Sequence, residues 1–553
     1  MQKREEIEIM NKGSKLLWTG ALALSLVGCS SGTSDTSASA GRKTLNLAKE
    51  NDVITMDSTL ATDGMSFEVI NMTIEGLETT DENGDIVPAL AESYDVSEDG
   101  LTYTFHLRDA SWDNGDPVTA ADFEYAWKDA ASDPTSDYAY IFGTDGACIK
   151  GAGEAMGNPE NKDALAVKAK DDKTFVVELE RKTPYFVSLT TFPPFYPVNE
   201  AFATEQGEQY GLSADTLMAC GPFKLVNWTK GNSLKLEKNE NYWGADDVAL
   251  EEINISIVPE PSSAALAFEN GTTDYARLNS SLVDKYKDNP AYKSVLGSFL
   301  WYLQYNLDNP DLQNENLRKA LAYVVDRDNL TQNVLKDGSI PAEGFVTRQL
   351  SNGPDGKDYR ETTEGFFLER GEDTKKLAQE YFEKAKKELG KDEITLRFLF
   401  EPSDPSKSAA EFMQSEFASL DGLNIEMVSQ EKNVRLKTQQ NGDFDLVLTR
   451  WGPDYADPTT YLNVLVPGGS FNFGKYDSDE YKKALDEAAN ASTDEARWDA
   501  LKKAEKIAME DVAVAPIFQT GASDLLNPSV KHLVDNPVGV PFVYKYVTID
   551  DQE

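Results

Sequence analysis

Histidine and cysteine are the residues that this sequence most lacks. Its 553 residues include two histidines and three cysteines. Catalytic triads and imidazole metal sites both need histidine, so His106 and His532 leave little room for a serine or cysteine hydrolase or a transition-metal centre. Neither a Gly-x-Ser-x-Gly elbow nor a His-Glu-x-x-His motif is present. The scarcity argues against an enzyme, a cofactor and a metal held by the protein alone.

Basic residues are also few. There are 53 lysines and arginines against 95 aspartates and glutamates, for a formal net charge of −42. No basic block offsets this balance, so nucleic acid and anionic membrane surfaces would be repelled. Simple solubility is the preferred interpretation of the charge. The chain exceeds the length that one hydrophobic core serves, which predicts two or three domains.

Long hydrophobic runs are absent apart from one near the N-terminus. Lys12 and Lys15 precede an apolar run, residues 16–26, which leads into Leu-Val-Gly-Cys ending at Cys29. The run is too short to span a bilayer permanently and predicts a signal peptide over residues 1–28. The acidic opening is wrong for such a leader, so Met10 is interpreted as the true start. Leu-Val-Gly-Cys resembles a bacterial lipobox, which implies cleavage before Cys29, a lipid on its thiol and a flexible tether over residues 29–41.

The other two cysteines are Cys148 and Cys220. In an exported protein they could form a disulfide. Two buried free thiols are an equally good interpretation, since nothing else in the chain indicates dependence on a disulfide.

The rest of the chain has a mixed α/β pattern without an internal repeat. Strict alternation of apolar residues predicts strands around 103–107, 175–179, 253–257 and 396–400. Apolar spacing and capping residues predict helices over 67–77, 315–325, 408–420, 479–490 and 494–510.

One stretch after a predicted buried strand, residues 444–450, indicates a binding site. Trp451, Gly452, Asp454 and Tyr455 follow within five positions. Gly452 is predicted to admit another backbone at close range. A carboxylate held between two aromatic rings suits a ligand cation, such as the α-ammonium of a peptide. The alternative is a β-turn in which Asp454 caps its own backbone and Trp451 packs in the core.

Several motifs follow one another in a fixed order and together cover nearly all of residues 44–546. They are Ala-Leu-Ala-Glu-Ser-Tyr at 89–94, residues 100–108, Trp-Asp-Asn-Gly-Asp-Pro-Val-Thr-Ala-Ala-Asp-Phe at 112–123, Tyr185-Phe186, 221–225, Asn241-Tyr242-Trp243, 318–320 with Asp326-Arg327, and 451–458. This series of motifs resembles a known family, the peptide-binding lipoproteins that feed ABC importers (the oligopeptide, dipeptide and nickel solute-binding proteins).

The resemblance implies an α/β fold of the periplasmic-binding-protein type, a two-lobed clamshell (cluster C) with three domains and a discontinuous first lobe. Domain I would comprise residues 42–85, 208–298 and 520–553, domain II residues 86–207, and domain III residues 299–519. The chain would cross between lobes near Phe299 and Gln519, and the lobes would close on ligand by a hinge motion.

The resemblance also implies a set of peptide-binding residues. Asp454 would pair with the N-terminal ammonium of the peptide, and the peptide backbone would add as a β-strand to residues 62–65 and 450–452. Tyr138 would line a side-chain pocket, and Trp301 and Tyr302 would either face the ligand or pack in the hinge. The full set is Asp454, Trp451, Gly452, Tyr455, Arg450, Tyr138, Thr62, Asp63, Gly64, Met65, Trp301 and Tyr302.

The sequence departs from the family pattern at three positions. Phe299 and Gly452 stand where some members have a disulfide, and Leu448 stands where some have a basic residue, although Arg450 is close by. Recognition of the peptide's C-terminal carboxylate, and with it peptide length, is therefore left open.

The partners implied are an oligopeptide ligand, the ABC permease subunits and the membrane reached by the lipid at Cys29, with no nucleic acid and a monomeric state. The expected location is the outer face of the cytoplasmic membrane of a Gram-positive bacterium. The alternatives are another solute of the same family, namely a dipeptide, a signalling peptide, haem or a metal chelate, or a lipid-anchored hydrolase.

Overall fold

A computed structural model describes residues 42–367, 372–536 and 538–550. The expected signal peptide, Cys29 and the tether over 29–41 lie outside the described residues. Within the described ranges, no helix combines the length and the apolar composition that a membrane span requires. Cys148 and Cys220 are both buried and unpaired, so the disulfide alternative is not the one found.

The larger of two main sheets has eleven strands. Its hydrogen-bonded path is β15 (Leu423–Ser429), β14 (Ile394–Phe400), β16 (Leu446–Trp451), β12 (Tyr292–Tyr305), β17 (Val514–Leu526), β11 (Tyr275–Leu278), β1 (Thr44–Lys49), β10 (Glu252–Ile257), β9 (Ser233–Lys238) and β8 (Phe223–Thr229), with β13 (Ile340–Pro341) on β17.

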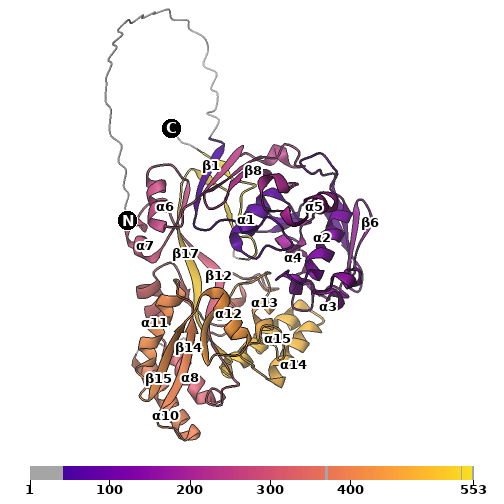
Figure 1. The fold of residues 1–553 in the computed structure, drawn as a ribbon. Helices are drawn as coiled ribbons and strands as arrows, with labels where there is room; N and C mark the ends of the chain where they lie inside the picture. The colour runs from indigo at the N-terminus through magenta and orange to yellow at the C-terminus, as the bar shows by residue number, and fades with distance from the viewer. Residues whose placement is uncertain (1–41, 368–371, 537, 551–553) are drawn as a thin grey trace, which may run out of the picture. The chain divides into compact units, whose positions relative to one another are not determined.

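Two long strands, β12 and β17, connect the two halves of this sheet. Figure 1 shows β17 running from the neighbourhood of β1 toward that of β14. Their antiparallel register shifts between the pairs Leu296–Gly521 and Leu300–Gln519. The Gln519 side chain spans this irregularity, donating to the carbonyl of Gly297 (2.8 Å) and accepting from the backbone N–H of Arg348 (3.0 Å). This irregularity is therefore braced by a buried amide, and a second register shift follows between Trp301 and Tyr302.

A separate antiparallel sheet has the order β4 (Ala91–Val96), β5 (Thr102–Leu107), β7 (Thr174–Glu178) and β6 (Val167–Asp171). The alternation of Tyr103, Phe105 and Leu107 produces a strand with one buried face. Helix α2 (Ala120–Ser132) packs beside β6 and β7, and a capping box of Thr119 and Asp122 fixes its start.

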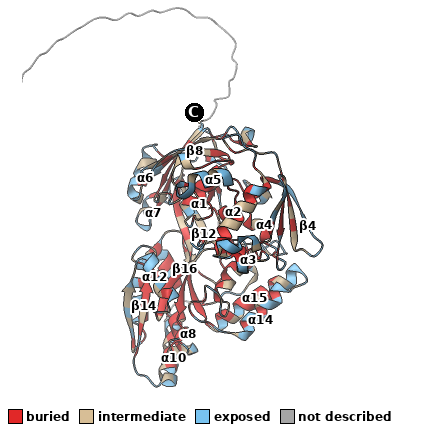
Figure 2. Ribbon diagram, turned by 45° about the vertical axis from the view of Figure 1, so that its right-hand side comes forward, coloured by how far each residue is buried: buried red, intermediate tan, exposed pale blue. Residues whose placement is uncertain are grey.

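Helices cover the larger sheet and connect its strands. The strands labelled β12 and β16 in Figure 2 are largely buried, while exposed residues gather on the helices farther out, such as α14 and α15. The main helices are α1 (Gly64–Thr73), α6 (Pro261–Glu269), α7 (Ser280–Tyr286), α8 (Glu315–Tyr323), α10 (Glu372–Leu389), α11 (Ser406–Phe417), α12 (Lys432–Gln440), α14 (Asp479–Ala489) and α15 (Asp494–Glu510).

The described chain also contains shorter α-helices and strands. They are α3 (Ala152–Ala155), α4 (Phe186–Leu189), α5 (Glu200–Gln206), α9 (Arg327–Asn329) and α13 (Thr459–Leu462), and the paired strands β2 (Glu78–Thr80) with β3 (Ile86–Pro88), β18 (Val530–Lys531) with β21 (Thr548–Ile549), and β19 (Val534–Asp535) with β20 (Phe542–Val543).

The first helix differs from its prediction over 67–77. It begins at Gly64, because the Asp63 carboxylate accepts from the backbone N–H of Ser66 (2.9 Å) as an N-cap. It ends at Thr73, and the backbone is extended at Ile74. Ile74 and Leu77 are buried outside the helix, so their helical spacing was misleading.

Candidate ligand-binding site

The loop that carries Asp454 follows directly on β16 and is held by two features of its own sequence. Asp457 forms a two-pronged ion pair with Arg497 of α15, with both N···O distances at 2.8 Å. The backbone N–H of Asp454 donates to the hydroxyl of Thr460 (3.2 Å). A bidentate pair restricts orientation as well as distance, so the loop presents Asp454 in a defined direction.

Asp454 is a carboxylate without a cation. The Tyr140 hydroxyl donates to its Oδ2 at 2.5 Å. Desolvation raises the pKa of Asp454 to about 6, although hydrogen bonding from tyrosine acts in the opposite direction. Among the described residues, no lysine, arginine or histidine nitrogen lies within 4 Å of it. The site therefore contains a negative charge that the protein itself does not neutralise.

Aromatic rings surround this carboxylate. Tyr455 stacks on Tyr185 with ring centroids 4.3 Å apart and an interplanar angle of 7°. Trp451 and Tyr140 both meet the ring of Phe471, at 4.8 and 5.0 Å. Trp451 and Tyr455 are thus both near Asp454, as the sequence predicted.

A small cavity borders Asp454. Trp451, Tyr140 and Phe471 form aromatic walls, and Asn463 contributes an amide. The indole N–H of Trp451 is buried without a hydrogen-bond partner. The carboxylate of Asp454 therefore borders a cavity whose walls are mainly aromatic.

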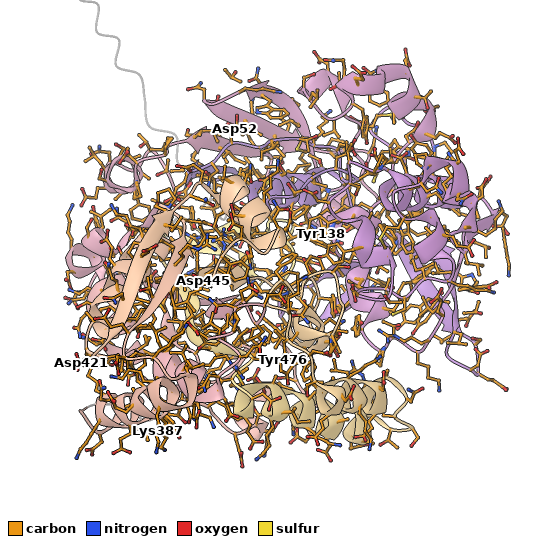
Figure 3. The ribbon with its side chains drawn as sticks, turned by 60° about the horizontal axis from the view of Figure 1, so that its bottom comes forward. Asp52, Tyr138, Lys387, Asp421, Asp445 and Tyr476 are labelled. Atoms are coloured by element: carbon orange, nitrogen blue, oxygen red, sulfur yellow. The ribbon has the colours of Figure 1, made fainter. Side chains whose placement is uncertain are left out.

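Tyr138 lies in the same place. Figure 3 shows it where the segment that contains α2 meets the later elements of the chain. Its ring packs on those of Phe67 and Phe192, 5.6 and 5.3 Å away, and on Tyr140 at 5.9 Å. Tyr140 was not predicted from the sequence. Its contact with Asp454 spans 314 residues, and its only sequence signal is its position two residues after Tyr138.

The segment of Thr62, Asp63, Gly64 and Met65 was predicted to pair with peptide as a strand. The structure corrects this for Gly64 and Met65, which form the first turn of α1. Thr62 is exposed, and Asp63 is the helix cap. Backbone N–H groups in a first turn have no intrahelical acceptor, so the segment can still donate to a ligand, but not as a strand.

The free edge of β16 fits backbone pairing better. β12 pairs with all six of its residues, 446–451, whereas β14 pairs only with Leu446 and Val447. No strand in the described part of the chain lies against the outer edge at Arg450 and Trp451. An unpaired edge is the feature to which an extended peptide adds as a strand.

Gly452 has a different neighbour from the one predicted. A Cβ at this position would lie 2.3 Å from Cε1 of Phe299, so an aromatic ring rather than another backbone approaches it. Phe299 is 47% exposed, whereas Trp301 and Tyr302 are buried at 1% and 3%. Trp301 stacks on Phe518 of β17, so packing within the sheet is the role that the geometry gives to this pair.

The described ranges contain no group of three or more histidine, cysteine, aspartate or glutamate side chains arranged to hold a metal ion.

Comparisons with known proteins agree over most of the chain. Residues 85–473 match the family model for bacterial extracellular solute-binding proteins, family 5. The chain is 33% identical to the dipeptide-binding protein DppE of Bacillus subtilis over 544 residues, which is 96% of this chain and 98% of that protein. It is 33% identical to the oligopeptide-binding protein OppA of the same organism over 493 residues, 87% of this chain and 88% of that protein.

Solved structures of peptide-binding proteins are also similar to this chain over most of its length. Listeria monocytogenes OppA bound to peptide has a TM-score of 0.78 at 34% identity, covering 93% of this chain and all of that one. The pheromone receptor PrgZ has a TM-score of 0.79 at 32% identity, covering 92% of this chain and all of that one. These structures confirm the fold class predicted from the sequence.

Proposed function

The chain belongs to family 5 of the bacterial extracellular solute-binding proteins, and we propose that it binds oligopeptides with their α-ammonium group at Asp454. The observation that carries this proposal is the partly buried carboxylate, which accepts from the Tyr140 hydroxyl and has no cation within 4 Å among the described residues. A charge in such surroundings is costly until an opposite charge reaches it. A peptide N-terminus is positive at neutral pH and supplies that charge together with three N–H donors.

The rest of the peptide would be bound through hydrogen bonds to its backbone. The outer edge of β16 at Arg450 and Trp451 is free for strand addition. Every peptide presents the same N–H and C=O groups to such an edge, so binding of this kind tolerates many side chains. The relatives are named for dipeptides, oligopeptides and a pheromone, which fits a shared backbone site with different side-chain pockets.

The wider setting follows from the family. We infer a lipoprotein anchored through Cys29 on the outer face of the cytoplasmic membrane of a Gram-positive bacterium. It would act as a monomer without enzymatic activity and deliver peptides to an ABC permease. The three-domain division at residues 86, 208, 299 and 520 belongs to the same proposal, and β12 and β17 support it because both pass between the halves of the larger sheet.

The test compares a peptide with its N-acetylated form by isothermal titration calorimetry. The wild-type protein should bind the free amine more tightly by a factor of about 30 to several thousand, the equivalent of about 2–5 kcal/mol for a buried charge pair. Asp454→Asn should abolish this preference. Asp421→Asn is the matched control, because Asp421 is exposed and lies far from Tyr138 in Figure 3. Equal losses for both peptides in Asp454→Asn would refute the ammonium site.

A further inference from the structure

A pair of stacked tyrosines connects two parts of the chain that belong to different sheets. Tyr185 immediately precedes α4 and follows the four-stranded sheet in sequence, whereas Tyr455 lies in the loop after β16 of the larger sheet. In the division proposed above, Tyr185 belongs to the first lobe and Tyr455 to the second. Both residues are buried, with 8% and 2% of their surfaces exposed. Separation of the lobes would therefore expose both ring faces to water.

Hydrogen bonds hold the same contact at its edges. The Tyr455 hydroxyl donates to the backbone carbonyl of Asp145 (3.2 Å), and the Tyr185 hydroxyl donates to the next carbonyl, that of Gly146 (3.1 Å). Both rings are thus bonded to one loop of the first lobe, although only Tyr185 belongs to that lobe. The guanidinium carbon of Arg497 in α15 also lies 5.9 Å from the Tyr185 ring centroid. Two residues of the second lobe therefore contact the Tyr185 ring.

The loop that accepts these hydrogen bonds, residues 144–148, is fixed by contacts within the first lobe. Arg181 donates through Nε to Sγ of Cys148 (3.1 Å) and through Nη2 to the first carbonyl of the loop (2.9 Å). A Cβ at Gly146 would lie 2.1 Å from the carbonyl oxygen of Ile141, so the backbone needs glycine for this close approach. The two acceptor carbonyls are therefore held in place independently of the second lobe.

The stacked pair differs from the residues that face the cavity beside Asp454. The residues that border this cavity in the described part of the chain include Tyr455 but not Tyr185. Both members of the stack belong to the protein, so the contact forms without any group of a peptide. An interaction that exists only when the lobes are together, and that does not involve the ligand, favours the closed arrangement equally for every peptide.

We propose that Tyr185, Tyr455 and the Asp145 carbonyl form an interlobe clasp that stabilises the closed arrangement, whatever the sequence or the end groups of the peptide. It rests on the proposed function and adds a control of affinity to it. When only the closed form binds tightly, the apparent dissociation constant rises as the closed fraction falls. Tyr185 acts through Tyr455, so it is a positioning residue. Loss of the stack should weaken all peptides by one common factor, about three- to tenfold for an aromatic pair.

The experiment compares the wild type with Tyr185→Leu, which removes the stacked ring, and with Tyr185→Phe, which keeps the ring and loses only its hydroxyl. Tyr94→Leu is the control for loss of a tyrosine ring within the first lobe. Tyr94 is 40% exposed on β4, and its ring packs on those of Tyr103 and Phe105 in the same sheet. Small-angle X-ray scattering measures the radius of gyration without peptide and with saturating pentaalanine. Calorimetric titration gives the dissociation constants of pentaalanine and N-acetyl-pentaalanine.

Tyr185→Leu should weaken both peptides by the same factor, about three- to tenfold, and leave the ratio of their affinities at the wild-type value. Without peptide its radius of gyration should exceed that of the wild type. With saturating peptide the radius should return to the wild-type value, which also shows that the variant is folded. Tyr185→Phe and Tyr94→Leu should match the wild type in both measurements.

A double-mutant cycle tests whether the two rings act as a pair. Tyr455→Leu should weaken both peptides, and adding Tyr185→Leu to it should cause no further loss. Tyr455→Phe, which removes only the hydrogen bond to Asp145, should weaken both peptides equally and by less than Tyr455→Leu.

Unchanged affinity together with an unchanged radius of gyration in Tyr185→Leu would overturn the clasp. Unequal losses for the free and acetylated peptides would also overturn it, because Tyr185 would then act on the ammonium group. A full further loss in the Tyr455→Leu background would have the same meaning. Failure of the proposed function gives a different result, in which no protein binds peptide while Tyr185→Leu still has the larger radius of gyration.

Discussion

The dependence of peptide affinity on pH follows directly from the pKa of Asp454, which desolvation raises to about 6. Ammonium binding favours the ionised carboxylate and must lower that pKa. Peptide binding therefore expels a proton from those molecules in which Asp454 is protonated. Affinity is expected to be highest above pH 6 and to fall as the pH drops through it.

The size of the effect can be worked out from the same value. With a pKa of about 6, roughly nine-tenths of the molecules carry an ionised Asp454 at pH 7 and about one-tenth at pH 5. The apparent affinity for a free-amine peptide should thus fall about tenfold between these values, which corresponds to about 1.4 kcal/mol. Below pH 5 the peptide's own carboxylate begins to titrate, so the comparison stops there.

Calorimetric titration at half-unit pH steps measures this slope, and buffers with different ionisation enthalpies count the protons released. Asp454→Asn is the matched control and should give a flat profile from pH 5 to pH 7. A flat profile in the wild type would refute the reasoning. So would a slope that survives in Asp454→Asn, because another group would then be responsible.

Four further perturbations have defined outcomes. Asp454→Asn should raise the free energy of unfolding of the ligand-free protein by up to about 3 kcal/mol above pH 6, and this gain should vanish below pH 4. The reason is that a carboxyl group with a raised pKa costs stability only once it is ionised. Thermal unfolding scans across pH measure the difference. Tyr140→Phe removes a donor to Asp454 and should move the midpoint of the affinity profile above pH 6. Gly452→Ala should lower the melting temperature, and adding Phe299→Ala should restore part of it, because the new Cβ meets that ring. Arg360→Met leaves the buried carboxylate of Glu505 without its ion-pair partner. It should lower the free energy of unfolding, measured in urea, by about 3–5 kcal/mol.

The sequence predicts the helices and strands correctly where the local pattern of apolar residues agrees with the tertiary packing. The prediction of a helix over 494–510 matches α15, and the alternating strand predicted around residues 103–107 forms β5. The helix predicted over 67–77 failed because Ile74 and Leu77 are buried by the surrounding fold rather than by a helical face. Apolar spacing reports burial, and burial alone does not specify which element carries the residue.

The candidate site likewise contains some residues that the sequence could predict and others that it could not. The aromatic neighbours Trp451 and Tyr455 were predicted because they adjoin Asp454 in sequence. Tyr140 could not be, because its hydroxyl meets that carboxylate across 314 residues. The neighbour of Gly452 was mistaken for a similar reason, since only the pairing of β12 with β16 brings Phe299 beside it.

The passage of β12 and β17 through both halves of the larger sheet also decides how this protein can be engineered. Neither half is a continuous piece of chain, so no simple truncation yields one of them intact. A fluorescent reporter of peptide binding would instead have to be inserted at an exposed hairpin such as the β8–β9 turn, where Gly231 has open space around it. An insertion there would leave β12 and β17, the strands that join the two halves, unbroken.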